Sequence, residues 1–455
     1  MSSSALCPAI LIAAPASGQG KTTVVAALAR LYTRRGLRVR VFKCGPDFLD
    51  PYWHCLASGA PVHQLDLWMT GETDCRARLA AAAQDADLIL VEGVMGLFDG
   101  EPSAADLAQR FGLPVLAVID ASAMAGTFGA LAFGLQHYRS DMPWAGVLAN
   151  RVASERHADM LRISLRDSEQ WRGAMMRDPA MALPERHLGL TVASEVVDGM
   201  ARLDAAANAL TKTPLGQLSL ADLRRWEVDF DAVPVDQASD YKPLLGHTIA
   251  IARDAAFCFI YAANLDCLHE LGAELVFFSP LVDTKLPECD AVWLPGGYPE
   301  LHAQKLGRNQ AMCTELRAHV ASSKPVWAEC GGMMLLFDEL MTLDGQSHRQ
   351  WSLLPGTVTM QERLAALGPQ QLAIGEHVLR GHTFHYSTCV TPLTAHTRTS
   401  RPDVNSVDGA GEALYQLGSV RASYFHAWFA SSPVATAALF LHSPHSLNSE
   451  AVAHG

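Results

Sequence analysis

Residues 9–23 read AILIAAPASGQGKTT, and the apolar run VVAALARLY (24–32) follows directly. This order of segments is typical of a buried strand, a glycine-rich loop and a helix. Gly18 and Gly20 allow backbone amides to curl around phosphate oxygens, and a helix that begins just after them turns its positive end toward the same anion. The sequence therefore predicts a phosphate site at the first strand of an α/β sheet.

The side chains of this loop predict a bound nucleotide. Lys21 supplies a positive charge to the terminal phosphates of ATP, and Thr22 supplies a hydroxyl to Mg²⁺. Ser17 and Thr23 complete the set of loop residues that we expect to contact the nucleotide. The strict GxxxxGK[ST] pattern has Gly where this chain has Pro15, so a structural glycine-rich turn is the alternative that the context disfavours.

Short apolar runs alternate with helical patterns in two series along the chain. The first series comprises 9–13, 37–42, 87–93, 113–120 and 144–150, and the second comprises 247–254, 273–279, 291–297 and 324–330. Runs that are hydrophobic throughout indicate parallel strands covered on both faces. We therefore expect two doubly wound α/β domains.

The stretch from Pro214 to Leu245 separates the two series, because it carries mixed charge, further prolines and no sustained apolar period. The expected boundaries are a domain with the phosphate loop at 1–225, a linker at 226–245, a second domain at 246–440 and a tail at 441–455.

Composition excludes several function classes. With 49% hydrophobic and 18% charged residues, the 455-residue chain is globular, and its net charge of −12 disfavours nucleic acid or an anionic membrane as a partner. The ten cysteines include no CxxC pair, and no Lys or Arg precedes the first apolar stretch. We expect a reducing cytoplasm and no membrane span. The oligomeric state stays open, with a homodimer as one option.

Two segments offer carboxylates for a metal beside the phosphates, namely FKCGPDFLDPYWH (42–54) and ILVEGVMGLFDG (89–100). Glu92 ends a buried strand, where an unpaired charge is costly, so a metal ligand is favoured over a structural ion pair. Asp47 is the second metal candidate, whereas Asp50, directly before Pro51, could equally be a turn residue. Lys43 could reach a transferring phosphoryl group, or it could be a snorkelling surface lysine.

The segment KPVWAECGGMMLLF (324–337) predicts a strand, a sharp turn and a helix around Cys330. Ala328 and Gly332 are small, as the strained turn of a nucleophile elbow requires. A helix N-terminus lowers the pKa of a thiol, so we expect a reactive thiolate, with a buried structural cysteine as the alternative.

A nucleophilic thiol also needs an oxyanion hole and a base. The backbone amides of Gly297, in LPGGYPE (294–300), and of Gly331 are the expected oxyanion donors. His426, in the strand-like run RASYFHAWF (421–429), is the expected base, and His382 and His385 are its rivals.

Together these motifs resemble the a,c-diamide synthases of corrin biosynthesis, within the cobyric-acid-synthase-like glutamine amidotransferases. The resemblance spans nearly the whole chain, and it rests on the phosphate loop, FKCGPDFLDP, VEGVMGLFDG, GVLANRV (146–152), ALPERHLGL (182–190), LPGGYPELH, AECGGMM, RGHTFHYS and ASYFHAWF. FKxGPDxxDP is the most specific of these motifs, because a generic phosphate-loop ATPase has no reason to carry it.

The resemblance implies a dethiobiotin-synthetase-like ATP domain fused to a class I amidotransferase domain. It implies that Asn150 lies near the adenine, that Asp99 lies on the corrin side, and that Cys330 and His426 form the glutaminase pair. The other residues that it assigns to ATP and Mg²⁺ are Lys21, Thr22, Asp47 and Glu92. The wider pattern expects His-x-Glu, but Trp428 stands two residues after His426, so the third member of the triad stays unassigned.

The predicted reaction is ATP-dependent amidation of the a and c carboxylates of cobyrinic or hydrogenobyrinic acid, with L-glutamine as the nitrogen donor. A related enzyme acting on another tetrapyrrole or on other corrin positions is the nearest alternative. A regulatory phosphate-loop ATPase with an inert C-terminal module, and a thiol hydrolase with a structural nucleotide, are alternatives from other classes, and the elbow at Cys330 argues against the first of these.

Overall fold

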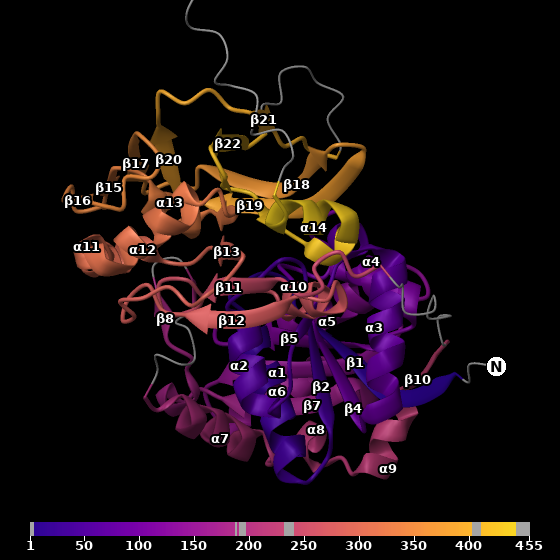
Figure 1. Cartoon of the computed structure of the whole chain (residues 1–455). Coiled ribbons are helices and arrows are strands. Elements are labelled where there is room, and N and C mark those ends of the chain that lie inside the picture. The colour runs from indigo at the N-terminus through magenta and orange to yellow at the C-terminus, as the bar shows by residue number, and fades with distance from the viewer. Residues whose placement is uncertain (1–3, 187–188, 191–196, 232–240, 403–410, 443–455) are drawn as a thin grey trace, which may run out of the picture. The chain divides into compact units, whose positions relative to one another are not determined.

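The computed structural model describes residues 4–186, 189–190, 197–231, 241–402 and 411–442, and the chain divides into two compact units, Met1–Gln237 and Ala238–Gly455 (Figure 1). Each unit is described by itself. Within the described residues, no helix combines the length and the apolar character that crossing a membrane requires.

The first unit is built on one sheet with the strand order β3-β2-β4-β1-β5-β6-β7. Every neighbouring pair along this order is parallel, as the uniformly apolar runs predict. The strands are β1 (Ala5–Ala13), β2 (Val39–Cys44), β3 (His63–Leu65), β4 (Leu88–Glu92), β5 (Val115–Asp120), β6 (Trp144–Val152) and β7 (Trp171–Met176).

Helices cover both faces of this sheet (Figure 1), because successive side chains of β1 enter opposite cores. Leu11 belongs to the core that includes buried residues of α3, α4, α5 and α6, whereas Ile12 belongs to the core that includes those of α1, α2 and α7. The helices are α1 (Lys21–Arg34), α2 (Asp50–Ser58), α3 (Glu72–Asp85), α4 (Ala104–Phe111), α5 (Thr127–His137), α6 (Glu155–Ser164), α7 (Gly199–Leu210), α8 (Pro214–Gln217) and α9 (Leu220–Leu223). The predicted doubly wound architecture is confirmed for this unit.

The expected linker, 226–245, begins with a strand. Residues Glu227–Phe230 form β10, which pairs antiparallel with the start of β1. Val228 and Phe230 are buried while their neighbours face outward, and a period of two over only four residues is too short to predict a strand. Within the linker and the expected tail, residues 232–240 and 443–455 lie outside the described part of the chain.

The second unit is built on a seven-stranded sheet with the order β12-β11-β13-β14-β23-β22-β21. The pairs from β12 to β23 are parallel, and the last two pairs are antiparallel. These strands are β11 (Thr248–Ala252), β12 (Glu274–Phe278), β13 (Ala291–Leu294), β14 (Val326–Glu329), β21 (Thr397–Arg398), β22 (Ala413–Leu417) and β23 (Val420–Ser423). Two hydrophobic cores lie on its two faces, packed by α10 (Ala262–Glu270), α11 (Ala303–Arg308), α12 (Gln310–Ala321), α13 (Gly331–Leu336) and α14 (Pro433–Phe440).

Smaller sheets add to this plan. In the second unit, β16-β15-β17-β20 and β18-β19-β24 form two sheets, and in the first unit β8 (Glu185–Arg186) pairs with β9 (Gly189–Leu190). The remaining strands are β15 (Glu339–Met341), β16 (Ser347–Arg349), β17 (Thr357–Met360), β18 (Ala366–Ile374), β19 (His377–His385), β20 (Ser387–Val390) and β24 (His426–Ala427).

The run 421–429 is not the single strand that its alternation suggests. β23 ends at Ser423, whose hydroxyl accepts a hydrogen bond from the Phe425 amide, and the chain then joins β19 as β24. His426 therefore belongs to a different sheet from the strand that precedes it.

Candidate functional site

The phosphate loop lies between the carboxyl end of β1 and the first turn of α1. Gly18 and Gly20 have φ values of 76° and 91°, in the left-handed region that favours glycine. Gly20 caps α1 without any side-chain hydrogen bond to the helix, so a bound anion can take the first amide groups. Asn150, at the end of β6, donates from Nδ2 to the Gln19 carbonyl at 2.8 Å and would collide with any side chain at residue 20.

The expected phosphate ligands of this loop differ in burial and in their contacts. Lys21 is buried, and its ammonium donates to the carbonyls of Ala16 (3.2 Å) and Met95 (2.5 Å). Burial and the nearby Lys43 lower the pKa of Lys21. Ser17 is exposed and Thr23 is half-buried.

An ion cluster centres on the buried Lys43, which is 2% exposed, so the surface-lysine alternative is wrong. Its ammonium lies 3.0 Å from Asp47, 2.8 Å from Asp50 and 3.4 Å from Glu92. The register of β2 against β4 pairs Lys43 with Glu92, and the loop after β2 brings the two aspartates back to the same atom. Asp50 is thus part of the cluster as well as the first residue of α2.

The charges of this cluster shift one another's pKa values. Burial alone would lower the pKa of Lys43, but Asp50, Glu92 and Asp47 hold it well above its usual value. Burial alone would raise the pKa of Glu92, but Lys43 and His54 bring it to about 2. Burial raises the pKa of Asp50 to about 6 against the effect of Lys43. Glu92 is therefore ionised at neutral pH.

His54 is a residue that the sequence reasoning missed. It is fully buried in α2, and its Nε2 forms a short hydrogen bond with Glu92 Oε2, while the Thr22 hydroxyl donates to Glu92 Oε1 at 2.7 Å. A histidine four residues after Asp50 lies one helical turn further along α2, which is the only local signal for it.

The donor set suits Mg²⁺ chemically, because Thr22, Asp47, Asp50 and Glu92 offer hydroxyl and carboxylate oxygens, the ligands that this hard cation prefers. Across the described residues, no group of three His, Cys, Asp or Glu side chains converges as a ready metal cage. The Lys43 ammonium lies among these carboxylates instead.

Asp99 is exposed after β4, and its carboxylate accepts the Gly96 amide at 2.8 Å.

In the second unit, Cys330 occupies a strained turn between β14 and α13. Its φ of 45° and ψ of −108° are values that a non-glycine residue adopts only under constraint from its surroundings. A side chain on Gly332 would strike the Leu294 carbonyl, and one on Gly331 would lie 3.0 Å from the Gly297 amide nitrogen. The turn therefore has the geometry of a nucleophile elbow, and it brings Gly331 against the loop that carries Gly297.

Burial acts against the thiolate that the helix N-terminus predicts. Burial, together with the charge of Glu300, raises the pKa of Cys330 well above its ordinary value. The thiol is therefore protonated at neutral pH. A base must accept its proton during the reaction.

His426 lies against the same glycine loop, because a Cβ on Gly296 would collide with its Cε1 atom. Its ring stacks on His382 with centroids 5.0 Å apart and an interplanar angle of 17°. Burial, with smaller effects of His382 and His385, lowers the pKa of His426 well below its usual value. His426 is therefore neutral and able to accept a proton.

The two rival histidines have other contacts. His382 Nδ1 is 3.2 Å from the Tyr261 hydroxyl. His385 stacks on Tyr424, and its ring nitrogens are 2.8 Å from the Ser387 carbonyl and 3.1 Å from Glu412 Oε1. Both ring nitrogens of His385 therefore already have oxygen partners.

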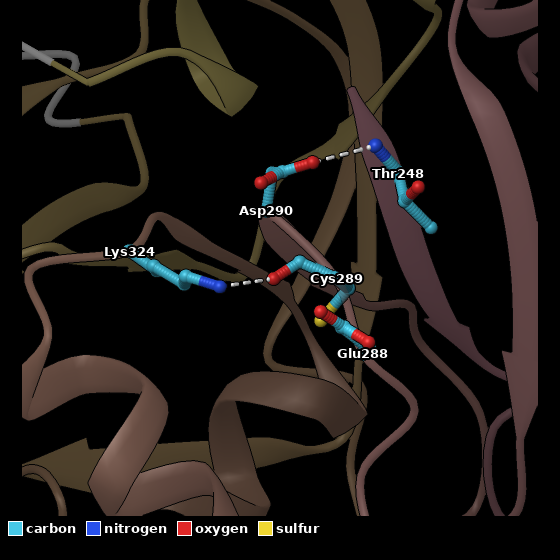
Figure 2. Close-up of a pocket in the computed structure, with 5 residues that line it drawn as sticks. All are labelled: Thr248, Glu288, Cys289, Asp290 and Lys324. Carbon is cyan, nitrogen blue, oxygen red and sulfur yellow. Dashed lines mark hydrogen bonds between the residues drawn. The ribbon is translucent and has the colours of Figure 1, made fainter. Parts of the chain in front are cut away.

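A small pocket in this unit lies away from Cys330. Figure 2 shows its lining residues, in which Asp290 accepts the Thr248 amide and Lys324 donates to the Cys289 carbonyl. Thr248 and Lys324 lie at the amino ends of β11 and β14, whereas Cys330 follows the carboxyl end of β14. The pocket therefore lies at the opposite end of these parallel strands and is not part of the thiol site.

Comparison with known proteins covers both units. The CobQ/CobB/MinD/ParA nucleotide binding domain matches residues 10–190, and the CobB/CobQ-like glutamine amidotransferase domain matches residues 248–434. A hydrogenobyrinate a,c-diamide synthase of Stutzerimonas stutzeri is 56% identical over 95% of this chain and 98% of its own. One of the same name from Pseudomonas aeruginosa is 55% identical over 96% and 98%, and a cobyrinate a,c-diamide synthase of Herminiimonas arsenicoxydans is 49% identical over 95% and 96%.

Proposed function

Because the chain belongs to the hydrogenobyrinate and cobyrinate a,c-diamide synthase family, we propose that it amidates the a and c side-chain carboxylates of hydrogenobyrinic or cobyrinic acid in cobalamin biosynthesis. ATP activates each carboxylate, and L-glutamine supplies the nitrogen. The observation that carries this function is the strained turn at Cys330, on a chain that also holds a phosphate loop and a buried carboxylate cluster.

In the ligase half-reaction, a substrate carboxylate attacks the γ-phosphorus of ATP, which yields an acyl phosphate and ADP. Ammonia then displaces phosphate to form the amide. The Lys21 and Lys43 ammonium groups neutralise charge on the transferring phosphoryl group. Ser17, Gly18, Gly20 and Thr23 bind the phosphates, Asn150 lies near the adenine, and Asp99 faces the corrin.

Mg²⁺ would be held by Thr22, Asp47 and Glu92, where it supplies charge neutralisation at the phosphates. Within the protein, His54 and the Thr22 hydroxyl orient the two oxygens of Glu92. Lys43, together with His54, keeps Glu92 ionised, because their charges oppose the effect of burial on the pKa of this carboxyl. These contacts explain why several acidic groups can lie close together in a buried site.

In the glutaminase half-reaction, Cys330 Sγ attacks the carboxamide carbon of glutamine. His426 accepts the thiol proton and delivers it to the departing ammonia, and the amides of Gly297 and Gly331 stabilise the oxyanion. Water then hydrolyses the thioester to glutamate and frees the thiol. Since burial favours the thiol and the neutral imidazole, proton transfer accompanies attack rather than preceding it.

We also propose a reducing cytoplasm as the place of reaction, because all ten cysteines are free thiols.

Incubation with ATP, Mg²⁺ and amide-¹⁵N-glutamine tests the function, with hydrogenobyrinic acid in one arm and cobyrinic acid in the other. Mass analysis should find two labelled amides in the preferred substrate. ATP hydrolysis without labelled amide in either arm would contradict the proposed reaction.

A further inference from the structure

The segment that carries His426 is held by two buried polar side chains from elsewhere in the fold. Glu329 Oε1 accepts the Ala427 amide at 3.3 Å and the Trp327 indole at 2.7 Å. From α10, the Asn264 Nδ2 group donates to the Ala427 carbonyl at 2.8 Å, and its Oδ1 accepts the Phe429 amide at 2.9 Å. Glu329 is 2% exposed and Asn264 is 1% exposed.

These contacts fix the backbone beside His426, where the local sequence offers no carboxylate to orient the base. A nucleophile and base pair normally has a third group that orients the base, and Trp428 occupies the position two residues after His426 where a carboxylate would be expected. Glu329 directly precedes Cys330, so one short stretch of chain bears the nucleophile and the carboxyl that bonds the residue after the base.

We infer that Glu329 and Asn264 form a clamp on the backbone of His426–Phe429 and are positioning residues for the glutaminase pair. The clamp acts on the main chain beside the imidazole, through the bonds of Ala427 and Phe429. This role rests on the proposed assignment of Cys330 and His426, and it adds a fixed link between their two strands.

The carboxyl of Glu329 can accept these hydrogen bonds while it is uncharged. Burial raises the pKa of Glu329 to about 8, so the carboxyl is protonated at neutral pH and its carbonyl oxygen can still accept both N–H groups. An ionised Glu329 would raise the pKa of the Cys330 thiol further, because it is one of the groups whose negative charge acts on Cys330. A neutral carboxyl therefore fixes the segment without opposing formation of the thiolate.

The test uses the full chain and compares Glu329→Gln with Glu329→Leu. Gln keeps an acceptor oxygen, so glutamine-dependent synthesis should stay within about threefold of wild type. Leu leaves the Ala427 and Trp327 donors buried and unsatisfied, and should lower kcat for glutamine use by about 10- to 100-fold. Synthesis from ammonium chloride should stay unchanged in both variants, because it does not use the thiol.

Gln350→Leu is the matched control, since Gln350 is also a buried polar residue of this unit, but its amide bonds the carbonyls of Ala303 and His348. It should destabilise the unit and leave kcat with glutamine close to wild type. Asn264→Ala provides an independent test and should also lower glutamine use selectively. Circular dichroism and thermal melting check the folding of each variant.

Wild-type glutamine use by a folded Glu329→Leu or Asn264→Ala variant would overturn the clamp, as would a Gln variant as impaired as the Leu variant. If Glu329→Leu does not fold, the Gln and Asn264→Ala variants still decide. Failure of the wild-type chain itself to use glutamine would instead overturn the proposed function, so the two failures are distinguishable.

Discussion

The two candidate sites of this chain differ in the charge of their ionisable groups. Around Lys43, charge is concentrated, with three carboxylates within 3.4 Å of one ammonium. Around Cys330, burial suppresses charge, because it favours the neutral thiol and the neutral imidazole. At the first site, opposite charges stabilise one another in the folded chain. The second site handles an uncharged amide and needs charge only during the reaction.

Cys330→Ala should produce the largest effect, and it tests the site at which burial favours the neutral thiol and imidazole. We expect complete loss of glutamine-dependent synthesis with retention of synthesis from ammonium salts, because the acyl phosphate needs only free ammonia. Cys313→Ala, which removes another buried thiol of the same unit, is the control and should keep both activities. Loss of both activities in a folded Cys330→Ala protein would show that Cys330 is not the glutaminase nucleophile.

His426→Asn should lower glutamine use by about 100- to 10,000-fold at every pH, the range for loss of a general acid and base. His382→Asn and His385→Asn should leave the thiol reactive. The measurement is alkylation of Cys330 by a glutamine-like electrophile across pH, with ammonium-dependent synthesis in parallel. Wild-type alkylation in His426→Asn, together with slow alkylation in another variant, would reassign the base.

Glu92→Gln tests the charged site. It preserves shape and removes one negative charge, so ATP-dependent amidation should fall by about 100-fold, on the scale of ~3 kcal/mol of lost electrostatic stabilisation. Glutamine hydrolysis without ATP should persist. Near wild-type amidation would instead make Glu92 part of a structural ion pair.

The smallest effect concerns stability against pH and separates the two buried glutamates. The folded pKa of Glu329, about 8, is above its unfolded value near 4.5, so its contribution to stability is lost as pH rises from about 5 to 8. Glu329→Gln should therefore show a smaller fall in melting temperature over this window than wild type. Glu92, with a folded pKa of about 2, acts in the opposite direction, and its contribution is lost as pH falls from about 4.5 to 2. An unchanged slope between pH 5 and 8 in Glu329→Gln would contradict the buried, protonated carboxyl.

Local sequence was sufficient where a motif and its structure lie within one strand, turn and helix. The phosphate loop and the Cys330 turn are of this kind, since glycines at 18, 20, 331 and 332 stand where any side chain would be strained or would collide. Both doubly wound sheets also follow from their apolar runs. β10 and the division of 421–429 between two sheets were missed, because short strands are decided by their partners.

The amino-acid sequence by itself determined the fold class and the two motifs on which the proposed site residues lie, because periodicity, glycine placement and local turns are encoded in consecutive residues. Only the tertiary structure decided how those residues are held. His54 reaches Glu92 across 38 positions, and Glu329 reaches Ala427 across 98. Such contacts depend on strand order and register, which bring distant segments together, and the same burial that forms them reverses the pKa expected for Cys330 from its helix alone.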